Sequence, residues 1–317
     1  MFLNIIIGIS GGSKTNYLLN QQCDNDVIID ADDLRLQLYG TLMTRRSQKT
    51  LLFAQVNKQL NVAIKQSRNI WYNAIDGSRK QRILLYNQAK KHGYHIRIIW
   101  FIDDMQQLLH CDEINHERLS LSFFKQHLLA MDPPIINLYC DEIIVKSKPH
   151  LRKYALIDDP LTFTSTFCAP NEVVAAQLLH NTIVPDNGIY HTESLQQHLQ
   201  LCIQMAHEVH EPILTTVAQW HDAGKVAVRK YDMQKHTYHY YDHEIYSSYA
   251  YLVSVLLHQH TITAQQFMIS QLIRWHMTPF RGISERLIMR EQLTPHMVAL
   301  LKQFNQIDMA ASLSKNQ

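Results

Sequence analysis

Residues 3–15 have the sequence LNIIIGISGGSKT, and this stretch decides the fold of the first half of the chain. The apolar, β-branched run from Leu3 to Ile7 is typical of a strand that is covered on both faces. A glycine-rich turn follows, and residues 14–21 then have a helical pattern. A strand that leads through such a turn into a helix predicts an α/β domain with a parallel sheet and flanking helices.

The same alternation continues to residue 145. Further strands are expected at residues 27–29, 69–74, 95–101 and 142–145, with helices at 34–39, 49–67, 81–91 and 119–131. From residue 195 onward the pattern is helical, at 195–210, 213–223, 244–258, 264–276 and 295–305, with a short hairpin or loop around 238–241. We therefore expect an α/β domain over residues 1–150, a connector over 151–185 and an all-α domain over 186–317.

The composition fits two globular domains. The chain has 317 residues, of which 46% are hydrophobic and 18% charged, and its net charge of +2 excludes a bulk polycation. The five cysteines contain no CxxC pair, so they indicate neither a disulfide framework nor a zinc ribbon. No apolar stretch reaches about 18 residues, and the first strand lacks a basic flank, so we expect a cytoplasmic protein with no membrane segment.

A phosphate-binding loop is expected after the first strand. The pattern G-x-x-x-x-G-K-[ST] is matched at Gly8, Lys14 and Thr15, whereas Ser13 stands at the second glycine position. In such a loop the backbone N–H groups and the helix N-terminus bind phosphates, while the lysine reaches the outer phosphates and the hydroxyl holds Mg²⁺. We expect ATP and Mg²⁺ to be bound by Gly8, Gly11, Gly12, Ser13, Lys14 and Thr15. A glycine-rich turn that binds no nucleotide is the alternative.

Asp32 and Arg35 follow the second strand at the start of a helix. A carboxylate there would accept a proton from an attacking hydroxyl, and the guanidinium would hold a substrate phosphate. The alternative is an ordinary, solvated helix start.

Together these segments resemble the phage-type polynucleotide 5′-kinase family over residues 3–145. The resemblance implies a P-loop kinase domain in which Lys14 and Thr15 hold the ATP phosphates and Mg²⁺. It also implies that Asp32 is the general base on a 5′-hydroxyl and that Arg35 contacts the neighbouring phosphate.

The sequence departs from this family at three places. Ser13 replaces the loop glycine, and Asn73 replaces the family's aspartate after the third strand. Residues 108–118 supply one lid arginine, Arg118, where the family has a pair. Phosphoryl transfer depends on positioned positive charge. A domain that binds nucleotide without transferring phosphate efficiently is therefore the alternative to an active kinase.

The second half contains an ordered set of metal-ligand residues. His221 and Asp222 end an apolar helical stretch, His198 lies upstream, and His243, His276 and Asp308 lie downstream. Mixed imidazole and carboxylate donors suit Mn²⁺, Co²⁺, Ni²⁺, Zn²⁺ or Fe²⁺. Histidines that only pack between helices are the alternative.

The order H…HD…H…H…D resembles the HD-domain metal-dependent phosphohydrolases over residues 186–312. The resemblance implies that His198, His221, Asp222 and Asp308 bind a first metal. It implies that His243 and His276 hold a second metal or the substrate phosphate. Lys225 would neutralise a phosphate oxygen.

A 5′-kinase joined to a phosphohydrolase predicts an RNA end-healing enzyme. Its substrates would be RNA (or DNA) ends with a 5′-hydroxyl and a 2′,3′-cyclic phosphate or phosphate, and an RNA ligase would be a partner. The same two domains are known as a family pairing. A second reading is an HD nucleotidase or phosphodiesterase with a weak P-loop domain, and a third is a binding protein without activity. Loss of kinase activity in Asp32→Ala would separate the first reading from the second.

Overall fold

The structure is a computed structural model, and it describes residues 1–8, 13–21, 23, 25–40, 46–73, 78–102, 121–134, 139–146, 195–258 and 262–313. The chain divides into two compact units, Met1–Lys148 and Pro149–Gln317. The connector predicted over residues 151–185 lies outside the described residues, as do Gly11, Gly12 and Arg118.

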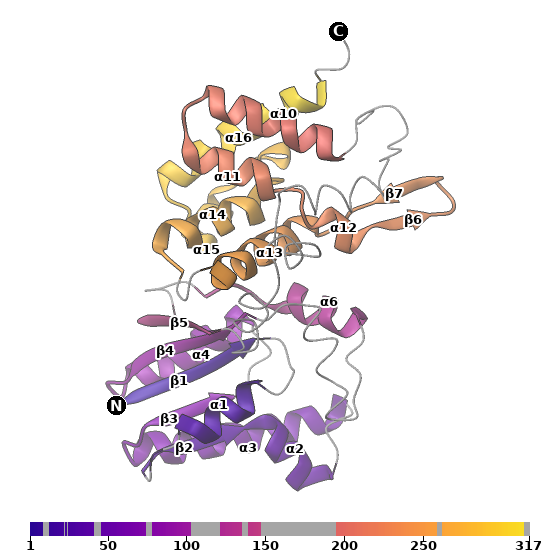
Figure 1. Ribbon diagram of the computed structural model, residues 1–317. Coiled ribbons are helices and arrows are strands. Elements are labelled where there is room, and N and C mark those ends of the chain that lie inside the picture. The colour runs from indigo at the N-terminus through magenta and orange to yellow at the C-terminus, as the bar shows by residue number, and fades with distance from the viewer. Residues whose placement is uncertain are drawn as a thin grey trace. The chain divides into compact units, whose positions relative to one another are not determined.

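The first unit is built on a five-stranded parallel sheet (Figure 1). Its strands are β1 (Phe2–Gly8), β2 (Val27–Asp30), β3 (Ile70–Asn73), β4 (His95–Phe101) and β5 (Glu142–Lys146), in the order β2-β3-β1-β4-β5. The predicted parallel sheet is therefore confirmed. Because all strands run in one direction, the ends of β1, β2 and β3 lie at the same edge of the sheet.

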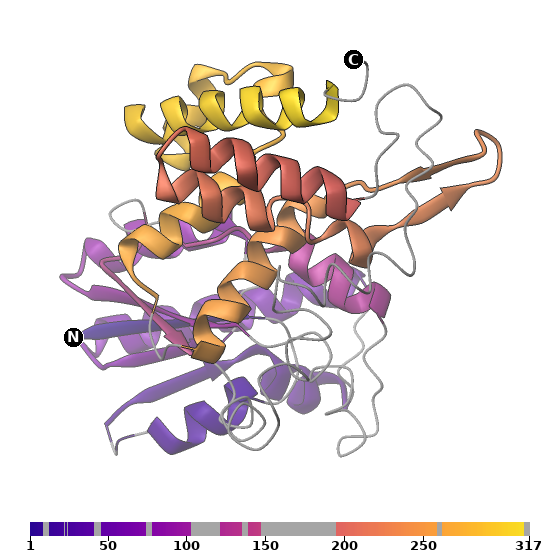
Figure 2. The ribbon, with the colours of Figure 1, turned by 45° about the horizontal axis from the view of Figure 1, so that its top comes forward.

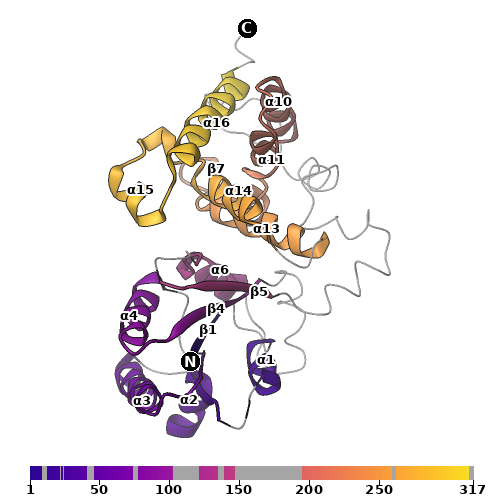
Figure 3. The same cartoon turned by 90° about the vertical axis from the view of Figure 1, so that its left-hand side faces the viewer.

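Helices cover both faces of this sheet, as Figure 3 shows for α1 (Ser13–Gln21) on one side and α3 (Arg46–Lys65) and α4 (Arg79–Lys90) on the other. The remaining described helices of the unit are α2 (Ala31–Tyr39) and α6 (Leu121–Ala130). Leu18 of α1 packs in a buried cluster with Ile6, Trp71, Ile99 and Phe101. Removing these large side chains from water is what holds the helix on the sheet.

The second unit is a helical assembly. Its helices are α10 (Leu195–Glu208), α11 (Pro212–Trp220), α12 (Lys225–Val228), α13 (His243–His258), α14 (Ala264–Trp275), α15 (Glu285–Glu291) and α16 (Pro295–Leu313), with a 3-10 turn at Pro279–Arg281. Helix α10 packs against α11 and α16, and α13 packs against α12 and α14. The helical C-terminal region expected from the sequence is present.

The sequence places a short hairpin or loop around residues 238–241, and the structure has a hairpin that begins earlier in the chain. This antiparallel hairpin consists of β6 (Lys230–Asp232) and β7 (Thr237–His239), and it extends away from the helices (Figure 2). The last helix continues to Leu313, eight residues beyond the predicted end at 305, and therefore includes Asp308. No helix of the described ranges is long and apolar enough to cross a membrane.

Candidate metal centre and phosphate-binding edge

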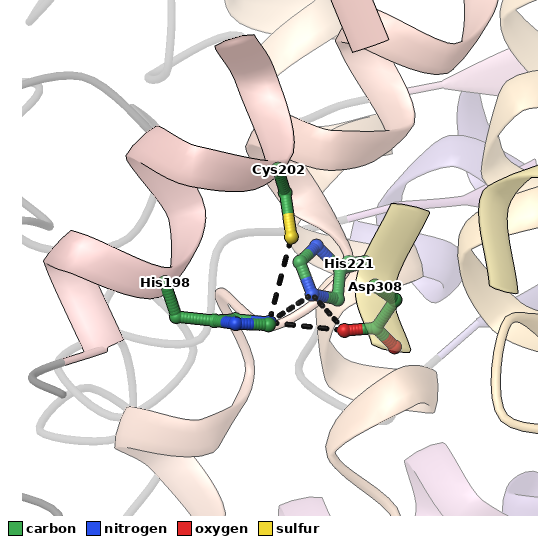
Figure 4. A group of neighbouring side chains, drawn as sticks. All are labelled: His198, Cys202, His221 and Asp308. Carbon is green, nitrogen blue, oxygen red and sulfur yellow. Dashed lines mark hydrogen bonds and ion pairs between the residues drawn. The ribbon is translucent and has the colours of Figure 1, made fainter. Parts of the chain in front are cut away.

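Four buried donor side chains from three places in the second unit meet at one point (Figure 4). His198 and Cys202 come from α10, His221 caps the end of α11, and Asp308 comes from α16. His198 Nε2 lies 3.3 Å from His221 Nε2, 3.0 Å from Asp308 Oδ1 and 3.6 Å from Cys202 Sγ. The ligand atoms of this first group all lie within 4.8 Å of one another.

A second group adjoins the first and consists of Asp222, His243 and His276. Asp222 Oδ1 lies 3.1 Å from His243 Nε2 and 3.9 Å from His276 Nε2. Its other oxygen, Oδ2, lies 3.4 Å from His221 Nε2 and 3.8 Å from His198 Nε2. The carboxylate of Asp222 therefore stands between two pairs of imidazoles, as a bridging ligand between two metal ions would.

Backbone carbonyls orient three of the imidazoles. The Nδ1 atoms of His221, His243 and His276 lie 3.0, 2.8 and 2.7 Å from the carbonyl oxygen three residues earlier in the chain. When Nδ1 donates its proton to that carbonyl, Nε2 carries the lone pair. This is the arrangement by which proteins hold a metal-ligating histidine in one tautomer and orientation, and it directs each Nε2 at the donor groups.

The charges of the site suit a cation. Burial lowers the pKa of His198, and burial together with His243 and His221 lowers the pKa of His276 to about 3. Burial alone would raise the pKa of Asp308, but the hydrogen bond with His198 and the charge of His221 hold it at about 2. Unprotonated imidazoles beside ionised carboxylates are the forms that bind metal.

His221 differs from its neighbours because the Asp222 carboxylate outweighs burial and raises the pKa of the imidazole. The same carboxylate has its pKa held well below the usual range, against the effect of burial, by Lys225 and His221. The carboxylates of Asp222 and Asp308 thus attract positive charge strongly. A metal ion would take the place of the proton on His221.

Lys225 lies beside Asp222 rather than apart from the donors. Its Nζ is 2.6 Å from Asp222 Oδ2, and Asp222 raises the pKa of the ammonium although burial opposes this. The resemblance to HD-domain phosphohydrolases implies that Lys225 neutralises a phosphate oxygen. The structure places its ammonium beside the Asp222 carboxylate.

Gly224 lets the His221–Asp222 turn approach the start of α13. A Cβ at this position would lie 2.2 Å from the carbonyl oxygen of His243 and 2.7 Å from the backbone nitrogen of Ser247. The Gly224 N–H donates to Ser247 Oγ at 2.8 Å. The glycine of the His-Asp-x-Gly-Lys segment is therefore required by this close packing.

The predicted phosphate loop begins at the carboxyl edge of the sheet in the first unit. Gly8 has φ +144°, and a Cβ there would lie 2.8 Å from the Cβ and the carbonyl oxygen of Phe101 on β4. Lys14 Nζ donates to the carbonyl oxygen of Gly8 at 2.9 Å. Ser13 and Thr15 lie in the first turn of α1, which starts at this edge. The lysine ammonium therefore lies where the strand ends and the loop begins.

Asp32 and Arg35 form an ion pair with each other in α2. The helix is capped by Asp30, whose Oδ1 accepts hydrogen bonds from the backbone N–H groups of Asp32 and Asp33 at 2.8 and 3.4 Å. Asn73 on the neighbouring strand donates to Asp30 Oδ2 at 2.8 Å. Burial raises the pKa of Asp30 despite these hydrogen bonds.

Sequence reasoning missed Asp30 and Cys202. Asp30 sits at a strand end before a helix, which is itself the signal of a capping residue. Cys202 lies four residues after His198 on one helix, and this spacing places two side chains on the same face. Both signals were available in the chain, but each is common among residues with no role in a site.

No protein-family model matches the chain, and no curated protein matches it.

Proposed function

We propose that the unit Pro149–Gln317 is a metal-dependent phosphohydrolase of the HD type. The observation that carries this proposal is the position of Asp222, whose two oxygens each approach a separate pair of imidazoles. Divalent transition metals (Mn²⁺, Co²⁺, Ni²⁺, Zn²⁺ or Fe²⁺) match the donor types. When bound, such a metal supplies a polarised phosphoryl oxygen and a hydroxide at neutral pH.

The residues of the chain would divide the remaining work. His198, His221 and Asp308 would hold one ion and His243 with His276 the other, and Asp222 would fix the spacing of the two. The ends of α11 and α14 at His221 and His276 favour a cation because helix C-termini carry partial negative charge. Lys225 would hold Asp222 in the orientation that serves both groups.

We further propose that the unit Met1–Lys148 is an ATP-dependent polynucleotide 5′-kinase. In open parallel sheets, ligands bind outside the carboxyl ends of the strands. Gly8 and Lys14 lie at that edge, and the α1 helix that begins there offers backbone N–H groups to a phosphate. Asp32 would accept the proton of the 5′-hydroxyl as the γ-phosphoryl group moves from ATP with Mg²⁺ to that oxygen.

Joined in one chain, the two activities would heal broken RNA ends. The kinase would add phosphate to a 5′-hydroxyl, and the hydrolase would open a 2′,3′-cyclic phosphate and release the phosphate, leaving ends that an RNA ligase can join. The Asp32–Arg35 ion pair favours a second candidate, in which the hydrolase acts alone beside a nucleotide-binding unit, because both charges are already satisfied by each other.

One RNA oligonucleotide with a 5′-hydroxyl and a 2′,3′-cyclic phosphate tests both proposals. The full chain is incubated with ATP, Mg²⁺ and Mn²⁺ or Ni²⁺, and both RNA ends are analysed by mass spectrometry. We expect phosphate gain at the 5′ end and phosphate loss at the 3′ end. Asp32→Ala should remove only the gain, and Asp222→Asn should remove only the loss, so each variant is the control for the other.

The outcomes separate the candidates. Phosphate loss without phosphate gain would favour the hydrolase with a nucleotide-binding unit. Phosphate loss that persists in Asp222→Asn would reject the metal centre as the source of the hydrolysis. No change at either end would reject RNA repair and direct the search to small nucleotides as substrates of the metal centre.

A further inference from the structure

Cys202 belongs to the first donor group, although the ordered set of histidines and aspartates found in the sequence contains no cysteine. Its side chain is completely buried, and its Sγ lies 3.6 Å from His198 Nε2. Helix α10 produces this contact because residues four apart lie on one face. Packing of α10 against α11 and α16 then places the same face toward His221 and Asp308.

The distances are those of ligands that share one ion. With metal–sulfur and metal–nitrogen bonds of about 2.3 and 2.1 Å, a tetrahedral centre separates S from N by about 3.6 Å and N from N by about 3.4 Å. The corresponding distances are 3.6 Å from Cys202 Sγ to His198 Nε2 and 3.3 Å from His198 Nε2 to His221 Nε2. His221 Nε2 and Asp308 Oδ1, at 3.7 Å, complete the set.

A buried cysteine that only fills space is the simplest alternative, since free cysteine behaves as a small apolar residue. Cys140 in the first unit is buried as completely as Cys202, and burial raises the pKa of its thiol to about 12. Among the described residues, Cys140 is not part of a group of metal donors, whereas Cys202 shares its group with three. Burial alone therefore does not account for the position of Cys202.

We propose that Cys202 is a protein ligand of the ion held by His198, His221 and Asp308, and that its sulfur makes this position select Zn²⁺, Co²⁺ or Fe²⁺ over Mn²⁺ and Mg²⁺. The inference rests on the proposed metal-dependent function. The thiol releases its proton to solvent as the sulfur–metal bond forms. Thiolate is a soft ligand, and soft ligands disfavour the hard ions that oxygen donors bind.

The adjoining second donor group should prefer different metal ions. Asp222, His243 and His276 offer imidazole and carboxylate donors only. Two neighbouring positions with different donor chemistry would hold two different ions, with the softer one at Cys202. Oxidation of the sulfur would then affect only the first position.

Cobalt spectroscopy on the full chain tests the proposal. Metal-free protein is titrated with Co²⁺, and the near-ultraviolet sulfur-to-cobalt charge-transfer absorption is followed beside the visible bands that report any bound Co²⁺. We expect the charge-transfer absorption in the wild type and in the control Cys140→Ser. Cys202→Ser should lose this absorption while retaining the visible Co²⁺ bands. Its preference for Zn²⁺ over Mn²⁺ should fall by at least about tenfold, because loss of even a residue that only hydrogen-bonds to a metal ligand lowers metal affinity by that factor or more.

A measurement without substitution covers the case in which Cys202→Ser does not fold. Zinc X-ray absorption on the wild-type holoprotein should record a sulfur neighbour at about 2.3 Å. Bound Co²⁺ or Zn²⁺ without a sulfur signal would overturn the role of Cys202 and leave the hydrolase proposal standing. Failure of the wild type to bind either ion would overturn both. A charge-transfer absorption that persists in a folded Cys202→Ser variant would also overturn the inference.

Discussion

Replacing Gly224 with alanine tests whether the turn that carries His221 and Asp222 lies against the start of α13. The added Cβ would come within 2.2 Å of the His243 carbonyl oxygen and 2.7 Å of the Ser247 nitrogen. Both are backbone atoms, so neither can move aside as a flexible side chain would. The backbone must shift, and the hydrogen bond from Gly224 N–H to Ser247 Oγ is lost with it.

The expected loss of stability follows from these two effects. Overpacking costs about 1–3 kcal/mol and the lost buried hydrogen bond about 1 kcal/mol, so unfolding of this unit should occur roughly 5–15 °C lower. Thermal unfolding followed by circular dichroism measures the shift. Since His243 is displaced from Asp222, hydrolysis of a 2′,3′-cyclic nucleotide should fall as well.

Ser247→Ala is the matched control. It removes the hydrogen bond to Gly224 and adds no volume, so it should cost only the hydrogen bond, about 1 kcal/mol, and leave the donor groups in place. A Gly224→Ala variant that unfolds within about 2 °C of the wild type and hydrolyses substrate normally would refute the close packing of this turn against α13.

Three further substitutions have separate readouts. His276→Ala should remove one bound ion per chain and spare the ion of the first group, as measured by metal content after dialysis. Lys14→Met should weaken ATP binding by about 10–100-fold in calorimetry, the value of one charge-assisted hydrogen bond, with hydrolysis unchanged. Burial tends to raise the pKa of Asp141, but hydrogen bonds from Lys90 and the backbone N–H of Ile96 hold it below its usual value. The ionised carboxylate therefore stabilises the fold at pH values above the unfolded pKa of about 3.9. In urea unfolding, the difference in unfolding free energy between Asp141→Asn and the wild type should disappear as the pH falls through the lowered pKa of the folded state.

Much of the fold could be predicted where the apolar pattern was strong. The run HIRIIWF predicts β4 with its observed bounds, because continuous apolar, β-branched residues are typical of a central strand. Helix α15 (Glu285–Glu291) was not predicted, and its only buried residue is Glu291. A short helix with so little buried surface has no clear apolar periodicity.

Prediction of the site residues from sequence is limited in a similar way. Asp32 and Arg35 were predicted as a catalytic pair from their residue types, but their spacing in a helix also lets them bind each other, and the structure has that ion pair. The sequence does not single out Asp30, although this residue caps α2 and accepts a hydrogen bond from Asn73 on the neighbouring strand. The pairing depends on strand register, which residue order alone does not supply.

The sequence by itself determined the kinds of donor in the second unit and their order along the chain, because residue type fixes which atoms can bind a cation. Only the tertiary structure decided that the Asp222 carboxylate lies between two pairs of imidazoles and that Cys202 joins the first donor group. Helical periodicity puts Cys202 and His198 on one face, but the distance from that face to Asp308 depends on how α10 and α16 pack against each other, which residue order alone does not give.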